Sequence, residues 1–321
     1  MGGKALKNTE TRRFLKEEFE TISATILREL QHLFPLARME IIRYYRNKQD
    51  FGDLDILVES SKLPEDYVEQ IKTSFQPKEM GLNGTCWSFD HNQLQVDFIK
   101  IPTKDYDIAK VYFAYNDLGN LMGRMADQMG FKYGHRGLLF FSRRDDHIAG
   151  EILVSQNPRK IFEFLGFDYD RHSQGFNELS EVFDFVINSQ YFYKDCFLLE
   201  NRNNKGRTRD RKRKVYTQFL EYIEKMNPSG NPLLDRSFYE KKAERFFELF
   251  KEQKEDLSRS LDEKELLASK FYGNLVKALT GKEGPNLGDF ICRFKKQHSD
   301  FDDWVKNTSP EDIEEAIKNF E

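Results

Sequence analysis

The chain has 321 residues, enough for two or three domains with a substantial hydrophobic core. Charged residues make up 32% and the net charge is −4, as in an ordinary soluble protein. Its three cysteines are far apart and form no CxxC or Cys/His cluster, which disfavours a disulfide framework and a zinc site. The polar N-terminus lacks the apolar core of a signal peptide, and no apolar run approaches the ~20 residues that cross a bilayer. We therefore expect a soluble intracellular (cytoplasmic) protein without a membrane partner.

The first hundred residues combine helical and strand patterns, which predicts an α+β layer. Apolar residues recur at helical spacing near the N-terminus, and apolar runs bounded by polar segments follow. An asparagine between the last two runs is typical of a hairpin turn. The expected elements are a helix over 10–33, strands over 37–45 and 53–60, a helix over 64–75, and a hairpin of strands over 84–90 and 94–101.

Strand patterns become sparse after residue 103, and helical spacing dominates the rest of the chain. We expect a helix over 107–130, a small hairpin formed by 131–141 and 151–154, and a helix over 157–167 that starts at an asparagine cap. The later helical patterns cover 180–192, 211–226, 237–253, 263–279 and 309–320.

Two aspartates, Asp53 and Asp55, flank Leu54 at the start of an apolar strand, and Asp97 lies in a similar strand, "LQVDFI". Side chains at i and i+2 of a strand point to the same face, so neighbouring strands would bring all three carboxylates together. Oxygen ligands without histidine or cysteine favour Mg²⁺, with Mn²⁺ as a substitute, and two such ions about 4 Å apart support phosphoryl displacement. The structural alternative is that the first two aspartates form a loop edge and the third is a solvated strand residue.

The segment "YYRNKQDFGDLDILV" (44–58) resembles the family X DNA polymerases, of the DNA polymerase beta type, whose pattern is G-S-Y-R-R-G-K-x-x-x-G-D-x-D-h-h. Four further segments resemble later motifs of this family in the same order: 94–102, 111–120, 130–140 and 157–169. The resemblance covers residues 10–172. The residues that fall on the first pattern are Tyr44, Arg46, Lys48, Gly52, Asp53 and Asp55.

The resemblance implies an α+β fold with a nucleotidyltransferase palm (1–103), a thumb-like subdomain (104–172) and a mostly α-helical C-terminal half (173–321). It implies transfer of a nucleoside monophosphate from a ribo- or deoxynucleoside triphosphate to the 3′-hydroxyl of DNA or RNA, as in DNA repair, with pyrophosphate release by a two-metal mechanism. The implied catalytic and metal-binding residues are Asp53, Asp55 and Asp97, and Asp97 would help to deprotonate the primer hydroxyl. The implied nucleotide-binding residues are Arg43, Arg46 at the triphosphate, Lys48, Gly52, Tyr112 and Phe113 at the sugar, and Asn120 at the base.

Two departures from the family pattern concern the nucleotide site. Ile42-Arg43 replaces the Gly-Ser of the nucleotide-binding turn, where a glycine lets the backbone approach phosphates closely. Ala114-Tyr115-Asn116 replaces the Thr-Gly-Ser that follows Tyr-Phe, which removes a flexible turn. These departures predict altered substrate geometry, and they leave open a catalytically silent nucleic-acid-binding protein on the same fold.

A strongly basic stretch, "NRNNKGRTRDRKRK" (201–214), contains eight Lys or Arg and one Asp. It carries +7, so the remaining 307 residues carry −11, and this contrast favours a polyanionic partner at one place. Contacts with phosphates would give a salt-dependent affinity for nucleic acid. The structural alternative is a solvated, disordered loop. The expected nucleic-acid-binding residues are Arg207, Arg209, Arg211, Lys212, Arg213 and Lys214.

A glycine-rich segment, "TGKEGPNLGDF" (280–290), separates two helical patterns near the C-terminus. It resembles both the hairpin of helix-hairpin-helix elements and a turn near the end of tRNA CCA-adding enzymes. The second resemblance, together with the helical C-terminal half, leaves open an RNA 3′-terminal nucleotidyltransferase. A plain interhelical turn is the structural alternative.

Overall fold

The computed structural model describes residues 5–144, 147–202, 204–228 and 254–320. The chain divides into two compact units, one formed by Met1–Leu139 with Ser155–Leu249 and the other by Phe140–Val154 with Phe250–Glu321. The domain boundaries predicted at residues 103 and 172 both fall inside the first unit. None of the helices in the described ranges is long and apolar enough to cross a membrane.

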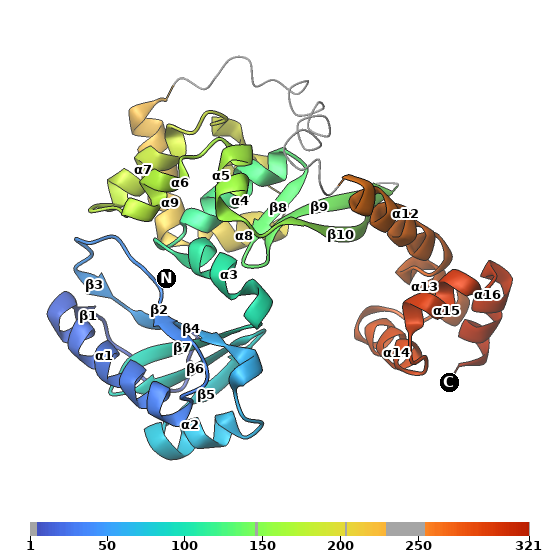
Figure 1. Ribbon diagram of the computed structural model, residues 1–321, viewed down its shortest axis with the longest axis horizontal. Coiled ribbons are helices and arrows are strands. Elements are labelled where there is room, and N and C mark those ends of the chain that lie inside the picture. Colours follow the sequence, from blue (N-terminus) through green and yellow to red (C-terminus); the bar gives the residue numbers. More distant parts are fainter. Residues whose placement is uncertain (1–4, 145–146, 203, 229–253, 321) are drawn as a thin grey trace. The chain divides into compact units, whose positions relative to one another are not determined.

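Residues 39–101 of the first unit contain a mixed five-stranded sheet (Figure 1). Its middle strands, β4 and β7, are parallel, and the other neighbouring pairs are antiparallel. The predicted α+β class is confirmed, because helices pack on this sheet. In spatial order the strands are β2 (Met39–Ile41), β4 (Asp53–Glu59), β7 (Leu94–Ile101), β6 (Cys86–His91) and β5 (Met80–Asn83).

Helices cover the two faces of the sheet differently. Helices α1 (Lys16–Leu33) and α2 (Tyr67–Phe75) share a hydrophobic core with the face that carries Leu54 and Ile56 (Figure 1). Helix α3 (Tyr106–Phe113) packs against Leu57 on the opposite face. Since strand side chains alternate, Asp53 and Asp55 lie on the same face as Leu57, beyond the part that α3 covers.

Several element boundaries differ from the sequence prediction because of tertiary pairing. Helix α1 begins at Lys16 and not at residue 10, since β1 (Phe14–Leu15) pairs with β3 (Asp50–Phe51). Strand β2 has only three residues. Strand β5 was not predicted, because its sequence "MGLN" contains two poor strand formers and gains its hydrogen bonds from β6.

The prediction of one continuous helix over 107–130 is wrong. The helix ends at Phe113, and α4 (Leu118–Gln128) begins after a turn in which Tyr115 and Asn116 have φ values of 59° and 63°. The Tyr115 N–H donates to the Arg43 carbonyl oxygen at 2.7 Å, and its buried ring contacts Phe176 edge to face. A left-handed turn is therefore kept here without a glycine, held by these tertiary contacts.

Strands β8 (Phe131–Gly134), β9 (Gly137–Arg144) and β10 (His147–Ser155) form a three-stranded sheet in the order β10-β9-β8, so both segments of the predicted hairpin, 131–141 and 151–154, lie in one sheet. The described residues between Ser155 and residue 228 are largely helical. Asn157 caps the next helix as predicted, accepting from the Lys160 N–H at 3.2 Å. The α-helices that follow are α5 (Pro158–Leu165), α6 (Tyr169–Gln174), α7 (Leu179–Ile187), α8 (Asn204–Arg211) and α9 (Lys214–Met226). Short 3₁₀ helices span Ser60–Lys62, Thr103–Asp105, Lys194–Cys196 and Leu199–Asn201.

The second unit contains a helical module with its own hydrophobic core. Its helices are α12 (Lys254–Lys270), α13 (Gly273–Thr280), α14 (Gly284–Lys296), α15 (Phe301–Asn307) and α16 (Pro310–Asn319). Buried residues such as Phe290, Phe294 and Ile313 form its core. The glycine-rich segment becomes a three-residue turn after α13 followed by the start of α14, with Gly281 left-handed. The predicted helix over 237–253 lies outside the described residues.

Candidate metal centre

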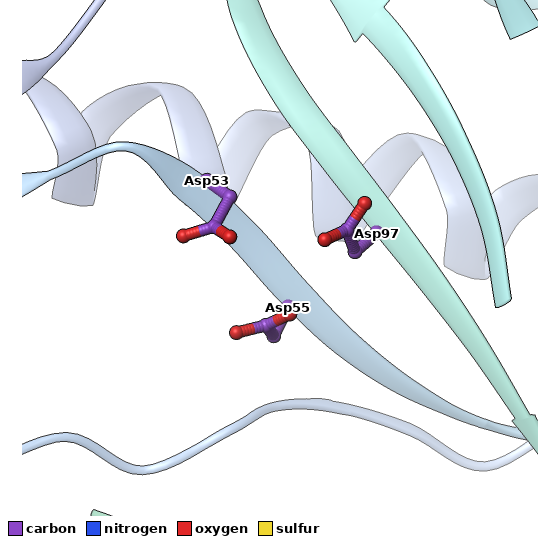
Figure 2. Close-up of side chains that lie close together, drawn as sticks. All are labelled: Asp53, Asp55 and Asp97. Carbon is purple, nitrogen blue, oxygen red and sulfur yellow. The ribbon is translucent and has the colours of Figure 1, made fainter. Parts of the chain in front are cut away.

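The three aspartates meet on one face of the central strand pair. In the parallel register of β4 and β7, Asp55 lies directly opposite Asp97, and Asp53 lies two residues before Asp55 on the same face. Each carboxylate offers one oxygen, and these oxygens lie within 4.8 Å of one another (Figure 2). The convergence expected from the spacing is confirmed, and the alternative of a loop edge is wrong for these residues.

Burial and mutual repulsion change the acidity of this triad. Burial, followed by the charges of Asp53 and Asp97, raises the pKa of Asp55 well above its ordinary value. Burial also raises the pKa of Asp97 to about 6, against hydrogen bonds from neighbouring side chains that lower it. A hard cation bound by oxygen ligands would relieve this repulsion. The donor set therefore fits a divalent cation such as Mg²⁺ or Mn²⁺.

Two polar side chains hold Asp97, and the sequence pattern did not identify them. Ser88, opposite Asp97 in the β6–β7 pair, donates its hydroxyl to Asp97 Oδ1 at 2.6 Å. The Gln95 amide Nε2 donates to both carboxylate oxygens, at 2.9 and 3.0 Å. Both side chains are buried. The i−2 position of Gln95 and the hairpin register of Ser88 are the signals that would have found them.

Lys48 and Gly52 lie next to the triad, as their places in the sequence suggest. The Lys48 ammonium is 4.4 Å from the ring centroid of Phe51, and burial lowers its pKa while the charges of Asp53 and Asp55 raise it. Gly52 is buried in the bend between β3 and β4. These two residues therefore place one positive charge and one tight bend beside the carboxylates.

Ile42 and Arg43, the two residues before Tyr44, are placed differently from each other. The Ile42 N–H donates to the Asp55 carbonyl oxygen at 3.0 Å, and its side chain packs against the apolar cluster that contains Leu57. Arg43 is exposed. Ile42 thus extends the apolar cluster on the face that carries the triad, whereas Arg43 lines a cavity with residues of α1.

Arg46 is tied to the loop that joins α6 and α7. Its N–H donates to the Phe176 carbonyl oxygen at 2.9 Å, and its guanidinium donates to Asn177 Oδ1 at 2.9 Å and to the Gln174 carbonyl oxygen. Arg43 and Arg46 line a shared cavity of about 610 Å³ together with Tyr115. The contact of Arg46 with a triphosphate stays a prediction, and it would require exchange of these hydrogen bonds.

Comparison with known proteins adds no assignment. No protein-family model matches the chain. No curated protein matches it either.

The residues expected at the sugar and base lie in packed surroundings. The Tyr112 ring contacts Phe113 and Tyr133 edge to face, with ring centroids 5.2 and 5.3 Å away. Asn120 Oδ1 accepts from Arg124 Nη2 at 3.1 Å, and the buried Asn120 Nδ2 makes no hydrogen bond within the described residues. Their predicted nucleotide contacts are untested, and here these side chains join α3, α4 and β8.

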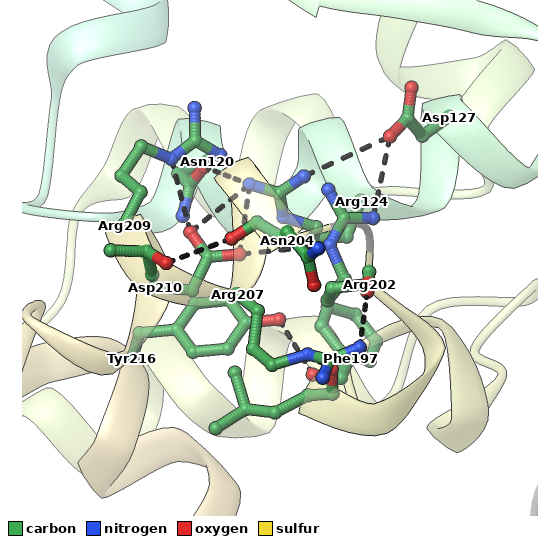
Figure 3. A network of polar contacts seen from close by, with 12 residues as sticks. Asn120, Arg124, Asp127, Phe197, Arg202, Asn204, Arg207, Arg209, Asp210 and Tyr216 are labelled. Atoms are coloured by element: carbon green, nitrogen blue, oxygen red, sulfur yellow. Dashed lines mark hydrogen bonds and ion pairs between the residues drawn. The ribbon is translucent and has the colours of Figure 1, made fainter.

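The basic stretch folds around its single acidic residue. Asp210 is fully buried and forms ion pairs with Arg124 at 3.2 Å, Arg209 at 3.2 Å and Arg202 at 3.7 Å (Figure 3). Arg124 is itself buried and belongs to α4, so these pairs fasten α8 to α4. The alternative of a disordered loop is wrong for residues 204–214, which form α8 and the start of α9.

The six basic residues expected to bind nucleic acid divide into two groups. Three have protein partners: Arg207 donates to the carbonyl oxygens of Leu199 and Arg202, Arg209 pairs with Asp210, and Arg213 pairs with Asp117. The other three, around the junction of α8 and α9, are exposed: Arg211, Lys212 and Lys214. The sequence pattern did not identify Arg124 and Asp210 as the centre of the arrangement.

Proposed function

We propose that the chain is a metal-dependent nucleotidyltransferase of the DNA polymerase beta type, with residues 1–103 as its palm. It would transfer a nucleoside monophosphate from a nucleoside triphosphate to a nucleic-acid 3′-hydroxyl. The observation that carries this proposal is the triad of Asp53, Asp55 and Asp97 on adjacent parallel strands, with oxygens within 4.8 Å. Such a site, built only of carboxylates, suits two-metal phosphoryl transfer better than zinc-dependent hydrolysis.

Asp53, Asp55 and Asp97 would hold the metal. When bound, Mg²⁺ supplies charge neutralisation for the attacking and departing oxygens. Asp97 Oδ1 accepts hydrogen bonds from both Ser88 and Gln95. Asp97 Oδ2 accepts one from Gln95 and none from Ser88. Oδ2 is thus the better placed atom to take the proton of a primer 3′-hydroxyl.

Positive charge is available for both substrates. Arg43 and Arg46 would bind the triphosphate, and Lys48 beside Asp53 and Asp55 would balance its charge. The cavity that the two arginines share is lined by α1 and by none of the three aspartates. The exposed residues Arg211 and Lys212 would contact the phosphate backbone of a nucleic acid without reading its sequence.

A second candidate is a catalytically silent nucleic-acid-binding protein. Ile42 packs into an apolar cluster at the place of the family glycine, and the Arg46 guanidinium is engaged by the loop after α6. Both features favour a protein whose former nucleotide site no longer binds a nucleotide. Binding without any metal-dependent transfer would support this candidate.

The direct test is primer extension with Mg²⁺ or Mn²⁺ on single-stranded, templated and gapped DNA and RNA primers. Deoxy- and ribonucleotides are supplied separately, and Asp55→Asn is compared with Glu69→Gln, an exposed carboxylate change on α2. We expect extension by the wild type and by Glu69→Gln but not by Asp55→Asn. Ribonucleotide addition without a template would identify the RNA terminal-transferase variant of the proposal.

A further inference from the structure

Residues 5–15, here called the N-terminal strap, are fastened to β7, which carries Asp97, and to β3, which directly precedes β4. At one end the Ala5 N–H donates to Gln95 Oε1 at 2.9 Å. At the other end β1 pairs with β3, whose last residue is separated from Asp53 by Gly52 alone. The strap thus reaches β7 near Asp97 and the start of β4 near Asp53.

Further contacts hold the strap along its length. The N–H groups of Lys7 and Asn8 donate to the Glu79 carboxylate, with distances of 3.0 and 2.7 Å. The Arg12 N–H donates to the Gln93 carbonyl oxygen at 2.9 Å. Backbone donors thus fix much of the strap, and the Arg13 guanidinium adds a contact to the Asp50 carboxylate at 2.6 Å.

Gln95 links the strap to the triad directly, with a hydrogen bond to Ala5 on one side and to Asp97 on the other. Its side chain is 2% exposed, and both ends of the amide are used. A backbone N–H can only donate, so it fixes the amide oxygen towards Ala5. The amide nitrogen must then face Asp97. Without the strap, the amide could turn and present its oxygen to a carboxylate, which would repel it.

We propose that the strap sets the orientation of Gln95 and that Gln95 is a positioning residue for Asp97, holding this carboxylate for a divalent cation. This inference rests on the metal site of the proposed function. A leucine at position 95 would fill the same buried space, but it would leave the Ala5 N–H and the Asp97 carboxylate without these bonds. A leucine substitution at position 95 therefore distinguishes a positioning role of the Gln95 amide from a role in packing alone.

The test is Mn²⁺ binding to the full chain, measured from the electron paramagnetic resonance signal of free Mn²⁺, with thermal melting to establish folding. We expect Gln95→Leu to weaken binding at least about ten-fold, as for other residues that orient metal ligands. Ala5→Pro removes the N–H donor and should weaken binding about five-fold, the effect of one lost hydrogen bond. Ala5→Gly keeps the donor and should bind as the wild type does.

The outcomes separate this inference from the proposed function. Unchanged Mn²⁺ binding by folded Gln95→Leu would overturn the positioning role, and equal binding by Ala5→Pro and Ala5→Gly would overturn the role of the strap. If Gln95→Leu does not fold, the two Ala5 variants decide alone. A wild type that binds Mn²⁺ but transfers no nucleotide would overturn the proposed function and leave this inference in place. A wild type that binds no Mn²⁺ would overturn both.

Discussion

The triad on β4 and β7 and the cluster around Asp210 are both charged and partly or fully buried, but their charges are arranged in opposite ways. In the triad, three carboxylates approach one another, and burial and repulsion raise the pKa values of Asp55 and Asp97. Around Asp210, three guanidiniums surround one carboxylate. In the second arrangement opposite charges pair within the protein, whereas an added cation would relieve the repulsion in the first. A buried cluster of carboxylates alone indicates a binding site for a cation, whereas a buried carboxylate paired with guanidiniums indicates a structural role.

The largest expected effect is the loss of activity in Asp55→Asn. Removal of a metal ligand should reduce nucleotide transfer by at least about 10³-fold, since the charge stabilisation of the transition state depends on it. The same change removes a buried like charge, so the metal-free variant should melt a few degrees higher than the wild type at pH 7. Primer extension and thermal melting measure the two effects. A variant that is both active and less stable would contradict the comparison.

The matched change in the other cluster, Asp210→Asn, should act on stability in the opposite direction. It leaves Arg124 buried without its main counter-charge, and loss of one partner of a buried pair costs about 3–5 kcal/mol. Urea unfolding monitored by circular dichroism measures this loss. Stability equal to that of the wild type would show that Asp210 does not fasten α8 to α4.

Gly119→Ala changes no charge and tests steric packing on α4, in contrast to the charge changes at Asp55 and Asp210. An added Cβ would overlap the Tyr112 carbonyl oxygen and come within 2.8 Å of the Tyr112 ring. We expect a loss of about 1–3 kcal/mol from overpacking between α3 and α4. Unfolding measurements on this variant and on Gly123→Ala, where the nearest atom is 3.4 Å away, form the matched pair. Equal losses in both would contradict the packing described for Tyr112.

The triad should also give the metal-free protein a characteristic pH dependence. The folded pKa of Asp97 is about 6, above its ordinary value of 3.8, so the folded state holds more protons between these values than the unfolded state does. The Asp97 contribution to stability therefore falls as pH rises from about 4 to 6. Asp97→Asn should be more stable than the wild type at pH 7 by up to about 3 kcal/mol, with no difference below about pH 4. A constant difference at both pH values would contradict this assignment.

The smallest expected effect concerns the exposed basic residues. Neutralising Arg211 and Lys212 together should weaken nucleic-acid binding and reduce the slope of log K against log salt by about 0.9 for each lost contact with duplex DNA. Lys72→Ala, an exposed lysine on α2, serves as the control. Fluorescence anisotropy over a salt series measures the slope. A slope identical to that of the wild type would remove these residues from the nucleic-acid site.

The triad was predictable because local rules determine it. The two-residue spacing places Asp53 and Asp55 on one face, and the hairpin that carries Asp97 has a recognisable turn, although the pairing of β7 with β4 had to be assumed. The supporting contact from Ser88 depends on strand register, and the contact from Ala5 to Gln95 spans ninety residues. Such partners are not encoded in any local pattern.

The same limit explains the errors elsewhere. The left-handed turn at Tyr115 interrupts a strong helical pattern because of a hydrogen bond to Arg43 and packing against Phe176. The sequence gives no sign that Asp210 is the buried centre of the basic stretch, because its main partner, Arg124, is 86 residues away. Tertiary contacts overrode local preference in both places.

The most direct test of the central claim is Mg²⁺-dependent primer extension by the wild type and by Asp55→Asn, with each protein first shown to be folded. The metal-centre account predicts that the wild type adds nucleotides to a DNA or RNA 3′ end only when the metal is present, and that Asp55→Asn adds none. Extension by Asp55→Asn at the wild-type rate, or no extension by the wild type on any of these ends, would contradict it.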